Sequence, residues 1–315
     1  MGAYWMLSYE NLSKKASIFK TFTGLEVNEF DTLYSKLEAL TPSFEEKRLS
    51  RSNRTRKAGA GHPYKLNLKN RFLMLLLYYR LYTSSTLLGF LLDLGQTNVL
   101  KDIRALEPAT QAILPLPKKV HDATRRLQTL EEVEGYFPGF KAFIDATEQE
   151  IPRPKSKLKR KTHYSGKKKK HTVKTQITVN KAGLIIHKTK HAKGSTHDYA
   201  LFKPSHPNLP GNVPVGVDLG YDGIQKDYPN LKAEVPFKRR STGRGKRGVK
   251  AKELSPEQKS FNLKLAKERI VVEHSFARLK KFRIWANEFR NRLKHYDVMT
   301  DIVSGINNFR IMGTA

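Results

Sequence analysis

The chain has 315 residues, which is enough for two domains and a substantial hydrophobic core. Lysine and arginine number 59 against 29 acidic residues, so the formal net charge is +30 at pH 7 and the expected partner is a polyanion, with DNA or RNA first. The absence of cysteine excludes disulfides and thiolate metal sites, and it fits a reducing cytoplasm.

The N-terminal region, 1–60, is predicted to hold packing helices followed by a basic arm. Leu25, Phe30, Leu33 and Leu37 recur near helical spacing. The arm, from Arg48 to Gly61, is rich in arginine and glycine. It suits either a contact along a DNA backbone or a plain solvated linker, and the sequence leaves both open.

Residues 61–117 are predicted to form a helix-turn-helix DNA-binding domain. A helix is expected over 65–81, and Arg80 cuts its apolar run far short of a bilayer span, so no membrane partner is expected. Beyond it, Gly89 and Val99 have the spacing of two short helices that bury one face across a tight turn. Asp93 stands where such turns usually have glycine, and aspartate tolerates the left-handed conformation.

The second of these helices is expected to begin at Gln96 and to present amides and cations outward. Such groups near a helix N-terminus can read base edges and phosphates, although a purely structural helix pair is the alternative. The residues expected to contact DNA are Gln96, Thr97, Asn98, Lys101 and Arg104.

Residues 118–315 predict an α/β domain built on a mixed sheet. The expected strands are 141–151, 172–179, 183–189 and 213–218, with a shorter candidate at 233–237. Helices are expected near Thr196 and Tyr221. A long C-terminal helix is signalled by a capping box from Ser255 to Gln258, with proline at the first helical position.

Three acidic residues occur beside apolar neighbours. Asp145 follows Phe143 and Ile144 in a strand, Asp218 ends another strand, and Glu273 lies in the C-terminal helix, where it is expected to border the buried stripe. A carboxylate in such a setting is costly unless it is paired or binds a metal. We therefore expect the three to meet around two Mg²⁺ (or Mn²⁺) ions, with Asp145 bridging them, which suits phosphoryl transfer.

Other assignments of these groups stay open on spacing alone. The acids could form separate salt bridges, with Asp218 capping its strand end and Glu273 paired with Arg269 or Arg278. Asp198 is an alternative second ligand or a helix cap. A zinc site from His187, His191 and His197 is a further alternative with weak support.

Two basic runs flank the positions from which the acids enter the site. They predict positive walls that guide DNA and release counterions on binding, or else loose polyanion-binding loops. The expected contacts in these runs are Lys168, Lys169, Lys170, Arg239 and Arg240. Arg278, on the C-terminal helix after Glu273, is also expected to hold a phosphate, with a plain surface position as the alternative.

Several blocks of the sequence resemble the DDE-type transposases, specifically the Harbinger-related insertion-sequence group (the IS-five family). The matching stretches appear in family order over most of residues 140–285 and are FIDATEQEIPRP, YSGKKKKHTVKTQ, GSTHDYALF, VGVDLGYDGI and ERIVVEHSFARLKKFR. The helix-turn-helix region is also similar to that of the family. Ala146 departs from the pattern, because many relatives have glycine there.

The resemblance implies a ribonuclease-H-like catalytic core, preceded here by the all-α helix-turn-helix domain, and catalytic roles for Asp145, Asp218 and Glu273. It also implies divalent metal and cut-and-paste DNA transposition. The expected partners are the element's terminal inverted repeats and target DNA, with a homodimer on DNA and a cytoplasmic, nucleoid-associated location. A domesticated regulator that no longer cuts, or a basic nucleic-acid-packing protein, is the alternative.

Overall fold

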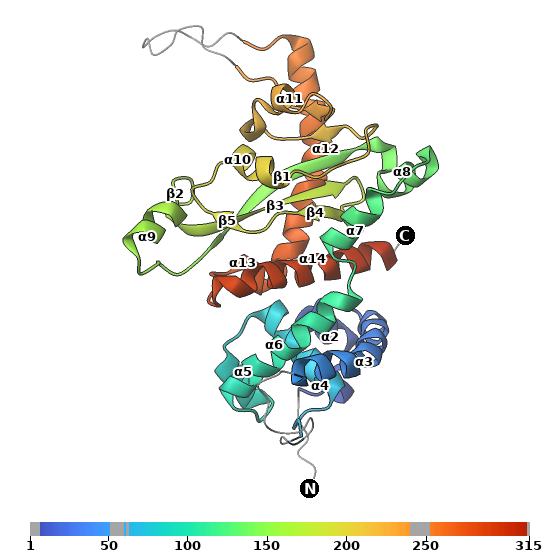
Figure 1. Ribbon diagram of the computed structural model, residues 1–315, viewed down its shortest axis with the longest axis vertical. Coiled ribbons are helices and arrows are strands. Elements are labelled where there is room, and N and C mark those ends of the chain that lie inside the picture. The colour runs from blue at the N-terminus through green and yellow to red at the C-terminus, as the bar shows by residue number, and fades with distance from the viewer. Residues whose placement is uncertain (1–6, 51–59, 61–62, 240–252, 314–315) are drawn as a thin grey trace. The chain divides into compact units, whose positions relative to one another are not determined.

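The computed structural model describes residues 7–50, 60, 63–239 and 253–313. These residues fall into two compact units (Figure 1). One combines 1–116 with 279–313 and is helical, and the other spans 117–278 and holds the sheet. The helical unit thus contains both N-terminal stretches, 1–60 and 61–116, together with the last helices of the chain.

The elements of the helical unit are α1 (Tyr9–Leu12), α2 (Ala16–Thr23), α3 (Val27–Leu49), α4 (Leu68–Leu81), α5 (Ser85–Leu91), α6 (Gln96–Ile113), α13 (Arg283–Ala286), η4 (Leu293–His295) and α14 (Tyr296–Gly313). The core of this unit is α4, whose residues from Phe72 to Tyr79 are all buried. A helix that is apolar around its whole circumference must be surrounded by others, and α2, α3, α6 and α13 all contact it. In the described part of the chain, no helix is long and apolar enough to cross a membrane.

One charged pair lies inside this apolar unit. The Arg71 guanidinium donates to Asp102 Oδ1 from Nε at 2.7 Å and lies 2.6 Å from the same oxygen through Nη2. Both residues are buried, and the Tyr64 ring lies 3.5 Å from the Arg71 guanidinium carbon. The pair joins α4 to α6 where neither charge reaches water freely, so each charge needs the other.

The elements of the α/β unit are α7 (Pro117–Thr124), α8 (Leu130–Tyr136), η1 (Pro138–Phe140), β1 (Ala142–Glu150), α9 (Lys157–His163), β2 (Tyr164–Ser165), β3 (Lys170–Asn180), β4 (Ile185–Lys188), β5 (Ala192–Lys193), α10 (Asp198–Phe202), η2 (Lys203–Ser205), β6 (Val215–Gly216), η3 (Leu219–Tyr221), α11 (Ile224–Asp227), β7 (Ala233–Glu234) and α12 (Pro256–Lys280). All five predicted strands are present, although β6 and β7 are shorter than predicted.

The sheet is mixed, as predicted, with strand order β2-β3-β1-β6-β7 and with β4 and β5 also paired to β3. The β1–β3 pair is antiparallel along its whole length, whereas β1–β6 and β6–β7 are parallel. Parallel pairing requires a long crossover between β1 and β6, and the antiparallel strands and α10 fill that interval. The arrangement makes β1 a central strand that begins beside β6.

Helices cover the two faces of the sheet at β1. The long helix α12 runs across the sheet (Figure 1), and Lys141 at the start of β1 bonds its Glu268 at 2.5 Å. On the other face, Ile144 packs in a cluster with Phe202 of α10 and Tyr221 of η3. The predicted capping box of α12 is present, because the Gln258 N–H donates to Ser255 Oγ at 3.2 Å.

Candidate active site and nucleic-acid interface

Asp145 occupies the interior of β1 and shares the α12 face of the sheet with Phe143, because side chains alternate along a strand. The Ala146 backbone N–H donates to its Oδ1 at 2.7 Å. The Arg269 guanidinium of α12 approaches Oδ2 at 3.7 Å. The side chain is 23% exposed, so a ligand can reach the carboxylate.

The electrostatic setting of Asp145 is unfavourable for its charge. Its pKa is raised to about 6, chiefly by burial, and the neighbouring carboxylates of Asp218 and Asp198 raise it as well. The Ala146 N–H and Arg269 lower it but do not offset these causes. A half-buried acid that lacks sufficient positive charge is typical of functional sites.

Asp218 comes from the neighbouring strand. The parallel register pairs Phe143 with Gly216, where β6 ends, and Asp218 lies two residues beyond that end. The residues before the two acids, Ile144 and Val217, share one buried cluster, and the Asp218 carboxylate lies close enough to raise the pKa of Asp145. Asp218 precedes η3, yet its side chain makes no capping hydrogen bond, so the strand-end cap considered from the sequence does not occupy it.

Asp198, the alternative ligand, begins α10, and its carboxylate lies close enough to raise the pKa of Asp145. The Lys174 ammonium donates to Asp198 Oδ1 at 2.8 Å and also lies 3.6 Å from Glu148 Oε1. Asp198 thus has a close cation of its own, unlike Asp145. Sequence reasoning missed Lys174, because its partners come from β1 and α10 and no local spacing links them.

Glu273 differs from its sequence prediction. It is exposed on α12, whereas the sequence predicted that it borders the buried stripe, so that prediction is wrong. The stripe itself is present as Leu265, Val272 and Phe276. The inward position belongs to Arg269, one turn earlier, which is half-buried and contacts Asp145. No spacing rule distinguishes these two faces until the helix is packed on the sheet.

The structure therefore places the Asp218 carboxylate near Asp145, whereas Glu273 is exposed on α12. Within the described ranges, no group of three or more His, Asp or Glu residues is placed to hold a metal ion. That finding includes the considered zinc site. His187 instead packs against His121 with ring centroids 5.2 Å apart, and burial lowers its pKa to about 4.

The helix pair in the helical unit has the local geometry that the sequence predicted. α6 begins at Gln96, and Asp93 adopts a left-handed φ of 49°. A Cβ added at Gly89 would collide with the Leu94 carbonyl oxygen, so the turn requires glycine there. Val99 is buried across the turn, and the predicted DNA-contacting residues Gln96, Thr97, Asn98, Lys101 and Arg104 are all exposed.

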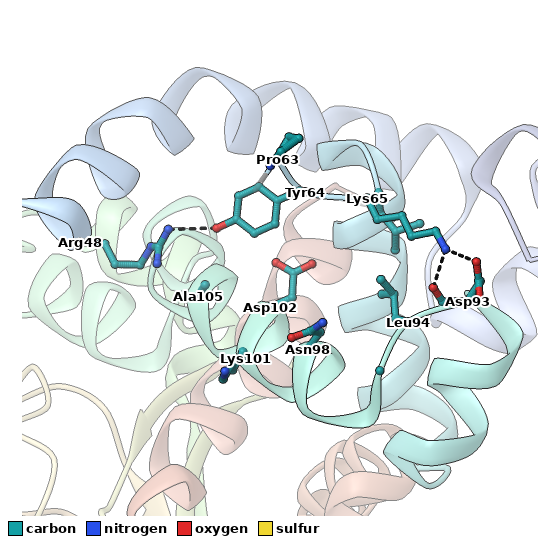
Figure 2. A pocket seen from close by; sticks show the side chains of 12 residues that line it. Arg48, Pro63, Tyr64, Lys65, Asp93, Leu94, Asn98, Lys101, Asp102 and Ala105 are labelled. Carbon is teal, nitrogen blue, oxygen red and sulfur yellow. Dashed lines mark hydrogen bonds and ion pairs between the residues drawn. The ribbon is translucent and has the colours of Figure 1, made fainter. Parts of the chain in front are cut away.

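A cavity of about 440 Å³ lies beside the first turns of α6 (Figure 2). Asn98 and Lys101 line it together with Arg48 and Lys65. The Arg48 guanidinium donates to the Tyr64 hydroxyl at 3.0 Å, which fixes the ring at the edge of this surface. Sequence reasoning did not connect Arg48 and Tyr64 with α6, because they lie far from it in the chain.

The predicted basic contacts of the α/β unit are exposed where they are described. Lys168 and Lys169 form the turn between β2 and β3, and Lys170 pairs with Glu150 at 2.8 Å. Arg239 is exposed after β7, and Arg240 lies outside the described residues. Arg278 is exposed on α12 beside Gly183 of the β3–β4 turn.

Comparison with known proteins shows to which proteins this chain is similar in sequence. The family described as "DDE superfamily endonuclease" matches residues 144–308. A protein of Microchaete diplosiphon named "Probable transposase for insertion sequence element IS702" is 30% identical over 261 residues, which cover 83% of this chain and 87% of that protein. No solved structure matches the chain.

Proposed function

The chain belongs to the DDE superfamily endonucleases, and we propose that it is the DNA transposase of an insertion sequence. In this proposal it binds the element's terminal inverted repeats, cuts DNA strands there and joins them to target DNA. The observation that carries the proposal is the half-buried Asp145 with the Asp218 carboxylate nearby, in a setting where burial first, and Asp218 in addition, raise the pKa of Asp145 to about 6. Their mixed sheet supports a ribonuclease-H-like core.

The acids fit a divalent cation, as the family generally uses. Asp145 and Asp218 offer hard oxygen donors near each other, and one or two carboxylates with water suffice for Mg²⁺. When bound, such ions activate an attacking oxygen and stabilise the leaving oxygen of a phosphodiester. Glu273 would complete the set from α12 through a side-chain movement, since it is exposed in the structure.

The chain's own groups have separate tasks around the acids. The Ala146 N–H holds one oxygen of Asp145 and so fixes the direction of the other. In the absence of DNA, the Arg269 guanidinium balances part of the negative charge of Asp145. The pair of Lys141 with Glu268 holds α12 against β1, and the pair of Lys141 with Glu234 links the start of β1 to β7.

DNA recognition is assigned to the two basic surfaces. The exposed N-terminal residues of α6, with Gln96 and Asn98 foremost, would read base edges of the terminal repeats, and Lys101 and Arg104 would hold phosphates. The exposed lysines 168–170, Arg239 and Arg278 would hold DNA at the acids. Two element ends must be joined, so we propose that a homodimer assembles on DNA in the nucleoid.

Nicking of supercoiled plasmid in the presence of Mg²⁺ tests the activity. The plasmid carries the element's ends, and Asp145→Asn, Asp218→Asn and Glu273→Gln should each lower the nicking rate by roughly 100-fold or more while DNA affinity is kept. Glu131→Gln, on the exposed surface of α8, is the matched control. Variants that nick at the wild-type rate would show that the acids are wrongly assigned.

Competition binding tests the recognition surface. The double substitution Gln96→Ala and Asn98→Ala should reduce the preference for terminal-repeat DNA over random DNA by roughly tenfold, since base contacts contribute specificity. Lys101→Ala should weaken binding to both DNAs equally. An unchanged preference in the double variant would remove α6 as the base-reading helix.

A further inference from the structure

A second concave surface lies within the α/β unit. Its volume is about 880 Å³, and its lining includes Leu219, Asp222, Phe237, Gln258 and Phe261. Leu219 directly follows Asp218 in the chain. The cavity therefore opens next to the residue that we assign to phosphodiester cleavage, and nothing in that assignment uses it.

The ring of Phe237 is held in an exposed position on this surface. Asn262 of α12 accepts from the Phe237 N–H at 2.8 Å and donates to its carbonyl at 2.9 Å. The backbone is thus fixed on both sides, yet 45% of Phe237 is exposed. Phe261 meets the ring edge-on with centroids 5.3 Å apart and sets its orientation.

A large aromatic ring that stays in contact with water forgoes the free energy that its burial would contribute to folding. Exposed apolar surface of this kind marks binding sites. Leu219 is also 40% exposed and lines the same cavity, so the ring is not the cavity's single exposed apolar side chain. A flat π-surface with apolar neighbours suits a flat aromatic ligand.

The charges around the cavity favour a ligand that carries phosphate on one side. Lys238 lines it and Arg239 follows, and both are exposed. Gln258 and Asp222 add hydrogen-bonding groups to the lining, and carboxylates and amides can bond the edges of bases. The acidic Glu253 at the rim is paired with Lys259 at 3.2 Å, so its charge is partly balanced.

We propose that this cavity receives an unpaired nucleobase from the DNA strand that is cut, with the base stacked on Phe237. The proposal rests on the proposed function, because it places the base next to Asp218. Lys238 and Arg239 hold the adjacent phosphates, and the captured base fixes the strand end relative to the acids. Stacking tolerates every base, so the cavity gives position and little sequence preference.

The test uses the full chain in EDTA, so that binding is measured without cleavage. The probe is a DNA hairpin whose duplex ends in one unpaired 2-aminopurine, and a blunt hairpin is the control DNA. Binding should quench the 2-aminopurine fluorescence of the wild type. Phe237→Ala should lose the quenching and weaken affinity for the overhanging hairpin by about tenfold, with blunt-hairpin affinity unchanged.

Two further variants guard the interpretation. Phe237→Trp keeps a stacking surface and should retain both the quenching and the affinity for the overhanging hairpin. Leu263→Ala changes another exposed apolar residue of the same unit (59% exposed) and should leave both quantities at the wild-type level. If Phe237→Ala quenches the 2-aminopurine fluorescence as strongly as the wild type does, the proposal is wrong. The nicking assay distinguishes failure of this proposal from failure of the proposed function. If the wild type nicks plasmid but Phe237→Ala binds the overhanging hairpin like the wild type, only the base-binding site is disproved. If Phe237→Ala loses the quenching but the wild type does not nick plasmid, only the cleavage function is disproved.

Discussion

Each of the two units contains an acid that is at least half-buried, and the two acids differ in how fully a nearby cation neutralises their charge. In the helical unit, Asp102 is buried with Arg71 at 2.6 Å. In the α/β unit, Asp145 has Arg269 only at 3.7 Å, with the carboxylates of Asp218 and Asp198 nearby. The first acid is neutralised by a partner of its own, and the second is not.

This difference separates an acid that maintains the fold from one that is available to a ligand. A close, buried ion pair is lost at great cost when one member is removed, because the other charge is left without a partner. An acid with too little positive charge nearby already carries a cost in the folded state. Substituting it should therefore damage the chemistry and spare the fold.

The largest effect on stability should follow from Arg71→Met. The change leaves Asp102 buried and unpaired and should lower the free energy of unfolding by about 3–5 kcal/mol. Urea unfolding followed by circular dichroism measures it. Adding Asp102→Asn to this variant should recover a large part of the loss, and a double variant as unstable as the single one would show that the charge pair is not the cause.

Asp145→Asn should have a smaller effect of opposite sign, and one that depends on pH. The folded pKa of about 6 lies above the ordinary value of 3.8, so between these values the folded state binds a proton that the unfolded state does not. Wild-type stability from this group therefore falls as pH rises through that window. In EDTA at pH 8, the variant should be more stable than the wild type by about 3 kcal/mol.

The control for this prediction is the same comparison at lower pH. The advantage of Asp145→Asn should shrink as pH falls through about 6 and vanish well below the ordinary pKa of 3.8, where wild-type Asp145 is protonated in both states. Chemical denaturation at each pH gives the difference between the two proteins. A difference that stays constant with pH would contradict the raised pKa.

The smallest effect on stability should follow from Lys170→Ala. Its pair with Glu150 is exposed on both sides, so its loss should change stability by about 0.5 kcal/mol or less. DNA affinity should still fall, and the slope of log affinity against log salt should decrease by about 0.9 if the lysine neutralises one phosphate. An unchanged slope would remove Lys170 from the DNA surface.

Much of the fold could be predicted because its signals are local. The capping box at Ser255, the turn glycine at Gly89 and the strand patterns all act between residues that are close in the chain. The return of residues 279–313 to the helical unit could not be predicted in this way. It depends on contacts such as the hydrogen bond from the Arg290 N–H to the Tyr82 hydroxyl and the packing of α14 with α6, which no periodicity specifies.

The site was predictable to the same degree. Asp145 and Asp218 stand out as acids at apolar strands, and the pairing of β1 with β6 brings them near each other. Helical periodicity was too coarse to show that Arg269, and not Glu273, faces the sheet. Lys174 and Asp198 meet across the fold, so only the assembled sheet reveals their pair.

Anomalous diffraction from crystals of the protein grown with Mn²⁺ tests most directly whether the incompletely neutralised acid is a ligand site. The account predicts a manganese peak in contact with both Asp145 and Asp218, and no peak there in Asp145→Asn crystals. Manganese bound only at other carboxylates, with Asp145 still beside Arg269 alone, would contradict it.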